Sequence, residues 1–397
     1  MWEDVAQSTN QNGSLWCNIP PRIALHTRYT HHRSNLSQLI VYCLTFAMSL
    51  LRLPPETLRQ IFDQLDSSFF QEDLGRLTIW KKWFDFALPA CLKCITLSHG
   101  ALRNLAISAA TKKPSSLENS LETLSLDLKG YQQGISTNSS EQFAQGSTPQ
   151  PPRNKDGWET PAKAWEKGLN DDLAQLAIIV QQSPRLRTLR VRAWSSPSAY
   201  RFPLEGYLSL PTMRALLSVE NLSVLVLDLS GTSLDPTGQQ VDEHNCPFIG
   251  DLLRTLQTLH LRMRSICPDV LKTQGFDKKL RLSTVVINLS LDTHQSDITS
   301  AAHSVPCGSL FGGLIQLRDD IQKQAEVLVT RMESPKTMRI LTHTLPQFDT
   351  LSLDVLTGKI MKLEDDAAWD EDGKTVREDS EPESEISDEE FDGFFDD

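Results

Sequence analysis

A short apolar phrase of the form Leu-x-x-Leu-x-Leu recurs along most of the chain. Its last two apolar positions enclose a polar one, which is the period-two pattern of a half-buried β-strand. Successive phrases begin 29, 65, 36, 34, 26 and 66 residues apart, so the short intervals match one repeating unit and the long ones nearly two. The phrases that predict strands are Leu92-Ile95-Leu97, Leu121-Leu124-Leu126, Leu186-Leu189-Val191, Leu222-Leu225-Leu227, Leu256-Leu259-Leu261, Leu282-Val285-Ile287 and Phe348-Leu351-Leu353.

Helical segments precede several of these phrases. We expect helices over 171–182, 211–219, 247–253 and 334–344. Helix followed by strand, repeated, is typical of an α/β solenoid in which each unit buries its apolar face on the next. The alternative is a generic α/β domain in which the leucine-rich strands are only core.

A longer amphipathic helix is predicted over 314–332, near the C-terminal end of the repeats. Its apolar residues fall along one stripe, which favours a helix that covers the core: Leu314, Leu317, Ile321, Ala325 and Leu328. The segment 132–168 is rich in Gln, Ser, Thr and Pro and nearly free of aliphatic residues, so we expect a mobile insertion there.

Two short amphipathic helices are predicted before the first phrase. Leu58, Ile61 and Leu65 recur at spacings of three and four, and Asp73 stands as an N-cap before a second helix that contains Trp83. About 40 residues in short helices bury their own apolar face poorly, so this region is expected to pack on a partner or a neighbouring domain.

The run LPPETLRQIFDQL, followed by DLGRLTIWKKWFDFALPA, resembles the F-box, and most of all the F-box proteins of filamentous fungi. The resemblance implies a small three-helix module, here 48–92, that docks on the Skp adaptor of SCF (Skp, cullin, F-box) ubiquitin ligases. It implies that the adaptor-facing residues are Leu53, Pro54, Leu58, Ile61, Leu65, Leu77 and Trp83. The alternative is that these residues are the core of an ordinary helical subdomain.

The repeats behind this module resemble the irregular leucine-rich arrays that follow many F-boxes. Regular leucine-rich repeats carry Asn three residues beyond the last Leu, and here that position holds Gly100, Lys129, Trp194, Ser230, Arg264, Ser290 and Leu356. The resemblance therefore implies an α + α/β chain: an F-box, then a degenerate leucine-rich-repeat-like solenoid over 93–363.

The residues before the F-box show no clear pattern apart from one apolar stretch, 39–51. Its 13 residues are too few for a membrane span of about 20, so we expect a buried helix and no membrane partner. Met48 lies inside this stretch, and our hypothesis is that it is the true start and that 1–47 is an irregular or gene-model extension.

Charge is unevenly distributed over the 397 residues. The net charge is -12, but 364–397 holds 17 acidic residues against Lys374 and Arg377, a local charge of -15 that leaves +3 for the rest. A nearly neutral body gives no broad nucleic-acid-binding surface. The acidic tail is expected to be disordered, and Ser380, Ser384 and Ser387 within it are candidates for phosphorylation by an acidophilic kinase.

The cysteines and candidate catalytic motifs point away from an enzyme. Seven dispersed cysteines and a polar N-terminus without a signal peptide favour a reducing compartment, the cytoplasm or the nucleus. The sequence contains no P-loop, no Gly-x-Ser-x-Gly and no His-Glu-x-x-His. We expect the Cys91-x-x-Cys94 pair to be small buried hydrophobic residues. The polar cluster Asp242, Glu243, His244 and Cys246 is expected to form a surface turn. We therefore predict no catalytic residue, metal or cofactor.

These features predict a non-enzymatic substrate receptor that binds the Skp adaptor, and through it cullin, while the repeats hold an unidentified protein substrate. One alternative is an F-box scaffold that acts without cullin. Another is a leucine-rich interaction protein unrelated to ubiquitin.

Overall fold

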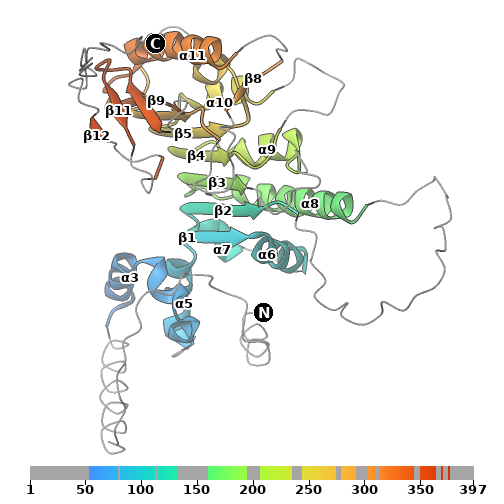
Figure 1. Ribbon diagram of the computed structural model, residues 1–397. Coiled ribbons are helices and arrows are strands. Elements are labelled where there is room, and N and C mark those ends of the chain that lie inside the picture. Colours follow the sequence, from blue (N-terminus) through green and yellow to red (C-terminus); the bar gives the residue numbers. More distant parts are fainter. Residues whose placement is uncertain are drawn as a thin grey trace, which may run out of the picture. The chain divides into compact units, whose positions relative to one another are not determined.

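The computed structural model describes residues 53–78, 81–111, 115–131, 160–194, 206–234, 244–273, 279–291, 303–308, 313–343, 349–363, 368–369 and 374–375. These residues have a mixed α/β fold with one large, mostly parallel sheet (Figure 1). The chain divides into two compact units, Met1–Leu58 and Arg59–Asp397.

The large sheet has the strand order β1-β2-β3-β4-β5-β7-β9-β10-β11-β12. Its first seven strands are parallel and follow chain order, and the last three add antiparallel pairs. The strands are β1 (Cys94–Ser98), β2 (Thr123–Lys129), β3 (Thr188–Trp194), β4 (Val224–Leu229), β5 (Thr258–Met263), β7 (Thr284–Asn288), β9 (Thr337–His343), β10 (Thr350–Asp354), β11 (Ile360–Lys362) and β12 (Lys374–Thr375). A separate parallel pair joins β6 (Ser265–Ile266) to β8 (Val305–Pro306).

The six phrases from Leu92 to Ile287 are confirmed as strands in matching register. Their second apolar positions form one row across the sheet, and their third positions form the next row. The first row runs Ile95, Leu124, Leu189, Leu225, Leu259 and Val285, and Met338 of β9 continues it. The phrase therefore marks the side of each strand that faces the helices, where burial of apolar area stabilises the sheet.

Helices connect the parallel strands and gather on one side of the sheet (Figure 1). They are α6 (His99–Thr111), α7 (Ser115–Ser120), α8 (Pro161–Gln181), α9 (Leu210–Leu217), α10 (Cys246–Leu252), η2 (Pro268–Leu271) and α11 (Leu314–Arg331). Local sequence sets their starts: Thr160 and Ser209 accept hydrogen bonds from backbone N–H groups at the starts of α8 and α9, and each is followed by a proline within two residues. The expected apolar stripe of α11 is confirmed, with Leu317, Ile321, Ala325 and Leu328 buried.

Tyr207 is the largest fully buried side chain of the core. Its ring packs 5.7 Å from that of Trp165, and its hydroxyl lies 3.2 Å from the carbonyl oxygens of both Leu128 and Trp194. Burial, followed by the negative charges of Asp228 and Asp127, raises its pKa well above the ordinary value. The neutral phenol therefore belongs to the folded state.

The prediction of a helix over 334–344 is wrong, because Thr337–His343 is strand β9. The phrase there begins with Pro335 in place of Leu, followed by Met338 and Ile340, so the apolar signal was incomplete. Phe348 lies outside the described residues, and the strand of its phrase, β10, runs antiparallel to β9 rather than continuing the parallel order.

The predicted mobile insertion is wrong at its C-terminal end. Pro161 begins α8, and Trp165 on that helix packs near Tyr131 and Tyr207. A single tryptophan anchored a segment whose composition is otherwise polar. Residues 132–159 lie outside the described residues.

The prediction of an acidic tail that is disordered throughout is wrong at two places. Lys374–Thr375 pairs with β11 as β12. Trp369 packs against Val286, Leu341 and Leu363, on the side of the sheet opposite the main core. Ser380, Ser384 and Ser387 lie outside the described residues, as do 39–51 and Met48. Among the helices that are described, none is long and apolar enough to cross a membrane.

Candidate functional site

The F-box-like sequence forms a group of short helices. They are α3 (Pro55–Gln64), α4 (Ser67–Gln71), η1 (Leu74–Leu77) and α5 (Lys81–Cys91). Asp66 and Asp73 cap α4 and η1 by accepting hydrogen bonds from the N–H groups of Ser68 and Gly75. Two aspartates thus fix where the chain turns between helices.

Aromatic side chains hold α4 and α5 against the C-terminal part of α3. The ring of Phe62 lies 5.9 Å from Phe70, 4.7 Å from Trp83 and 6.3 Å from Phe86. Phe62 and Phe70 are buried. Aromatic pairs at such distances contribute about 0.5–1.5 kcal/mol beyond their buried area, so this cluster supplies the small core that short helices need.

Hydrogen bonds to backbone carbonyls tie the connecting segments to this core. The indole Nε1 of Trp83 donates to the carbonyl of Arg76 over 2.6 Å, and the amide of Gln71 donates to the carbonyls of Cys91 and Cys94 over 3.3 and 2.6 Å. Trp83 therefore has a structural role within the chain.

The structure separates the predicted adaptor-facing residues into two groups. Leu58 and Leu77 are buried, so their side chains are not available on the surface. Pro54 is exposed, and the partly exposed residues are Leu53, Ile61, Leu65 and Trp83.

Two exposed apolar side chains of this region were missed by the sequence analysis. Phe69 on α4 is 38 % exposed and Leu74 on η1 is 45 % exposed. The guanidinium of Arg76 lies 4.3 Å from the centre of the Phe69 ring. A helix of four or five residues shows no 3.6-residue period, so the sequence could not tell which of its apolar residues face outward.

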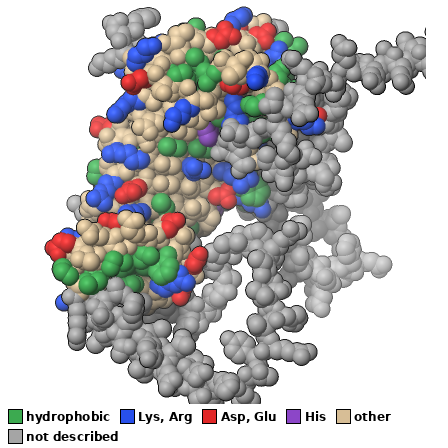
Figure 2. Space-filling model, turned by 90° about the vertical axis from the view of Figure 1, so that its left-hand side faces the viewer, with side chains coloured by type: hydrophobic (Ala, Val, Ile, Leu, Met, Phe, Trp, Pro, Cys, Tyr) green, Lys and Arg blue, Asp and Glu red, His purple; other side chains and the backbone are tan. Residues whose placement is uncertain are grey.

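The strand face opposite the helices offers a second surface. Trp194 on β3 donates a hydrogen bond from Nε1 to Asp127 on β2 over 2.8 Å, and Lys129 Nζ lies 4.9 Å from its ring centre. Further along the sheet, on β4 and β5, Arg262 makes two hydrogen bonds to Asp228, 2.9 Å from Nε and 2.7 Å from Nη2, and both residues are buried. In the face drawn in Figure 2, basic and acidic side chains are interspersed, and hydrophobic side chains gather in a band at the lower end.

No protein-family model matches this chain, and no match to it is found among curated proteins. Assignment of a function therefore depends on the residues of the chain itself.

The expected surface turn at 242–246 differs from what the structure shows. Asp242 and Glu243 lie outside the described residues, but Cys246 is fully buried, and His244 and Cys246 lie beside Cys267 and Cys307. Hydrogen bonding with Cys246 and Cys307 lowers the pKa of the Cys267 thiol, whereas hydrogen bonding with Cys267 and Cys307, together with burial, raises that of Cys246.

The Cys91-x-x-Cys94 pair is not part of this cluster. Both thiols are free, Cys91 is buried and Cys94 is partly buried. Burial raises the pKa of Cys91, which favours the unreactive thiol.

Proposed function

We propose that this chain is the substrate-recognition subunit of an SCF-type ubiquitin ligase, without enzymatic activity of its own. The helices from α3 to α5 bind a Skp-family adaptor, and through it cullin. The sheet holds a protein substrate. Ubiquitin transfer is then promoted by proximity, because the substrate is held near a conjugating enzyme carried by the complex.

The observation that carries this proposal is the exposure of Phe69 and Leu74 within the sequence that resembles an F-box. Large apolar residues that stay exposed on consecutive short helices favour the binding of a partner, because association removes their apolar surface from water. Further accessible apolar area in the same sequence comes from Leu53, Pro54, Ile61 and Leu65.

The repeat architecture supports the second half of the proposal, an irregular leucine-rich-repeat-like platform. Parallel strands in chain order present their side chains in rows, which provides an extended surface for protein binding. Trp194, which contacts Asp127 and Lys129 on this face, is of the residue type most enriched where protein interfaces are strong. As a subunit of such a complex, the chain would be located in the cytoplasm or the nucleus.

Co-purification with a Skp-family adaptor tests the proposal. Leu74→Asp is expected to lower adaptor recovery by about tenfold or more, equivalent to about 1.4 kcal/mol. Ile178→Asp is the matched control, because Ile178 is an equally apolar residue that is 50 % exposed on α8. Equal adaptor recovery by the two variants would overturn the placement of the adaptor surface.

The same pull-down separates the alternatives. Recovery of adaptor without cullin would favour a scaffold that acts outside ubiquitin transfer. If the unsubstituted chain recovers no Skp-family adaptor, the alternative of a leucine-rich interaction protein unrelated to ubiquitin is favoured. If the double variant Leu53→Ala/Pro54→Ala keeps its fold but no longer recovers the adaptor, the F-box interpretation is supported.

A further inference from the structure

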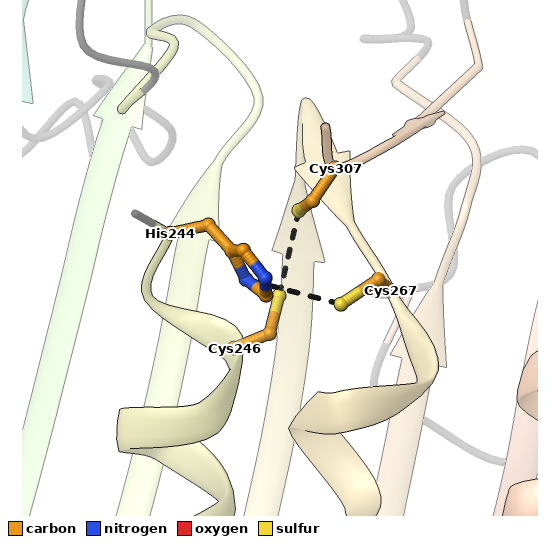
Figure 3. Close-up of side chains that lie close together, drawn as sticks. All are labelled: His244, Cys246, Cys267 and Cys307. Atoms are coloured by element: carbon orange, nitrogen blue, oxygen red, sulfur yellow. Dashed lines mark hydrogen bonds between the residues drawn. The ribbon is translucent and has the colours of Figure 1, made fainter. Parts of the chain in front are cut away.

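Four side chains of metal-binding types, from three separate segments of the sequence, meet in one place. They are His244, Cys246, Cys267 and Cys307, and their donor atoms all lie within 4.8 Å of one another. Figure 3 shows the four side chains converging from separate segments of the chain. From this geometry we propose that the chain binds a structural zinc ion through one histidine and three cysteines.

The sheet topology explains why the three segments meet. Each follows one of three neighbouring parallel strands, β4, β5 and β7, whose carboxyl ends lie at the same edge of the sheet. The chain after β5 and the chain after β7 then pair again as β6 and β8, with Ile266 opposite Pro306. The next residue on each side is a cysteine, so this pairing sets Cys267 and Cys307 beside each other.

A close approach between two helical segments completes the frame. Gly250 on α10 packs against η2 so tightly that an added Cβ would lie 2.7 Å from the carbonyl oxygen of Asp269 and closer still to that of Lys272. Only glycine permits this contact. It brings the start of α10, with His244 and Cys246, against the segment that carries Cys267.

The donor distances suit one tetrahedral ion. Zinc–sulfur bonds of about 2.3 Å place two sulfurs of a tetrahedron about 3.8 Å apart. The Sγ atoms of Cys246 and Cys307 are 3.7 Å apart, and Sγ of Cys267 is 3.8 Å from Nδ1 of His244. A disulfide would require about 2.05 Å, so these cysteines are arranged around a common point rather than bonded in pairs.

A carboxylate lies near the second ring nitrogen of His244. Its Nδ1 faces Cys267, and its other ring nitrogen, Nε2, lies 4.0 Å from a carboxylate oxygen of Asp269. Metal-bound histidines commonly direct their second nitrogen to a carboxylate, which fixes the ring and its tautomer. Lys272 in turn holds Asp269 with a 2.6 Å ion pair.

The donor set also indicates the role of the ion. Three thiolates and one imidazole fill all four positions of tetrahedral zinc, which is the pattern of structural sites, whereas catalytic sites keep a position open for water. The ion would therefore clip together the connections that follow β4, β5 and β7. This inference does not depend on the proposed function.

Metal analysis of the untagged full chain, produced with added zinc and purified in reducing buffer, tests the site. We expect one equivalent of zinc per chain, and loss of that zinc in Cys267→Ala and Cys307→Ala. Cys94→Ser is the matched control, because Cys94 is a free, partly buried cysteine outside the cluster. Zinc content no higher in the unsubstituted chain than in the cluster variants would overturn the proposal.

Cobalt(II) provides a readout that does not depend on whether a cysteine variant folds. Loading the full chain with cobalt should give the intense visible d–d bands of a tetrahedral, thiolate-ligated ion, and His244→Cys should keep them. Asp269→Asn should retain the bands but weaken zinc affinity by about 10–100-fold in competition with a chromogenic chelator. Only the weak spectrum of hydrated cobalt, or a Cys246–Cys307 disulfide found by mass spectrometry in the reduced preparation, would refute the site.

Discussion

The ion pair between Asp228 and Arg262 allows a quantitative test of how the strand face is built. The two residues stand directly opposite each other on β4 and β5, and their side chains are 7 % and 10 % exposed. Arg262 contacts both carboxylate oxygens, and the backbone N–H of Ser230 also donates to Asp228 over 3.3 Å. Asp228→Ala would remove this carboxylate from the buried guanidinium, which also lies 5.7 Å from the centre of the Trp369 ring.

Breaking a buried pair from one side costs about 3–5 kcal/mol, because the remaining charge keeps its desolvation penalty. We expect that loss for Asp228→Ala, which is large against a typical total stability of about 5–15 kcal/mol. The double variant Asp228→Leu/Arg262→Met removes both charges and should recover most of the loss. That recovery would show that the pair adds little net stability over an apolar pair of similar size.

Urea unfolding followed by circular dichroism measures these differences, and the single variants Asp228→Leu and Arg262→Met complete a double-mutant cycle with the double variant. Asp320→Ala serves as control, because Asp320 and Lys323 form an exposed pair on α11 with a 3.9 Å separation, and exposed pairs contribute about 0–1 kcal/mol. A loss for Asp228→Ala no larger than that of the control would refute the reasoning. So would additive single-residue effects in the cycle.

Three further predictions concern substitutions of single residues. The pKa of Tyr207 is raised in the folded state, so its contribution to stability is complete below the unfolded pKa of about 10 and is lost as pH rises above it. Urea unfolding should therefore show Tyr207→Phe to be about 1 kcal/mol less stable than the unsubstituted chain at pH 7. This difference should shrink above pH 10. Trp369→Ala should lower the unfolding free energy by about 1–2 kcal/mol, less than the about 3–5 kcal/mol of a fully buried tryptophan, and should speed tryptic cleavage at Lys374; unchanged cleavage would count against the anchoring of the tail. Gly250→Ala should destabilise the chain by at least about 1–3 kcal/mol through the clash with η2, whereas Gly168→Ala, with open space on α8, should raise the melting temperature slightly; the same sign for both would contradict the packing.

The strands were predictable where the local signal agreed with the tertiary environment. From Leu92 to Ile287 each phrase faces the same core, so the same apolar spacing recurs in each. At β9 the first position is Pro335, so the pattern there predicts a helix where the structure has a strand. Trp165 and Trp369 each anchor a segment whose composition alone indicates no fixed structure, because the packing of one partly buried aromatic ring can outweigh several polar neighbours.

The surface features were less predictable, for a different reason. The stripe of α3 identifies apolar residues, but only packing separates its inward and outward members, since Leu58 is buried and Ile61 is partly exposed. Phe69 and Leu74 belong to helices too short to display a period.

The Cys and His cluster depends on topology rather than on a local motif. His244 and Cys246 are two residues apart, but Cys267 and Cys307 follow at intervals that fit no standard zinc signature. Their shared property is that each segment follows a different strand of a parallel array. Once β4, β5 and β7 are known to be parallel neighbours, the three segments must leave the same edge of the sheet, and their cysteines become candidates for a common ligand set. A sequence survey that collects thiols and imidazoles by the strand they follow, rather than by their spacing, would have found this cluster. If zinc binds there, the unequal lengths of chain between successive strands in this region have a physical cause, because each connection must be long enough to reach the ion.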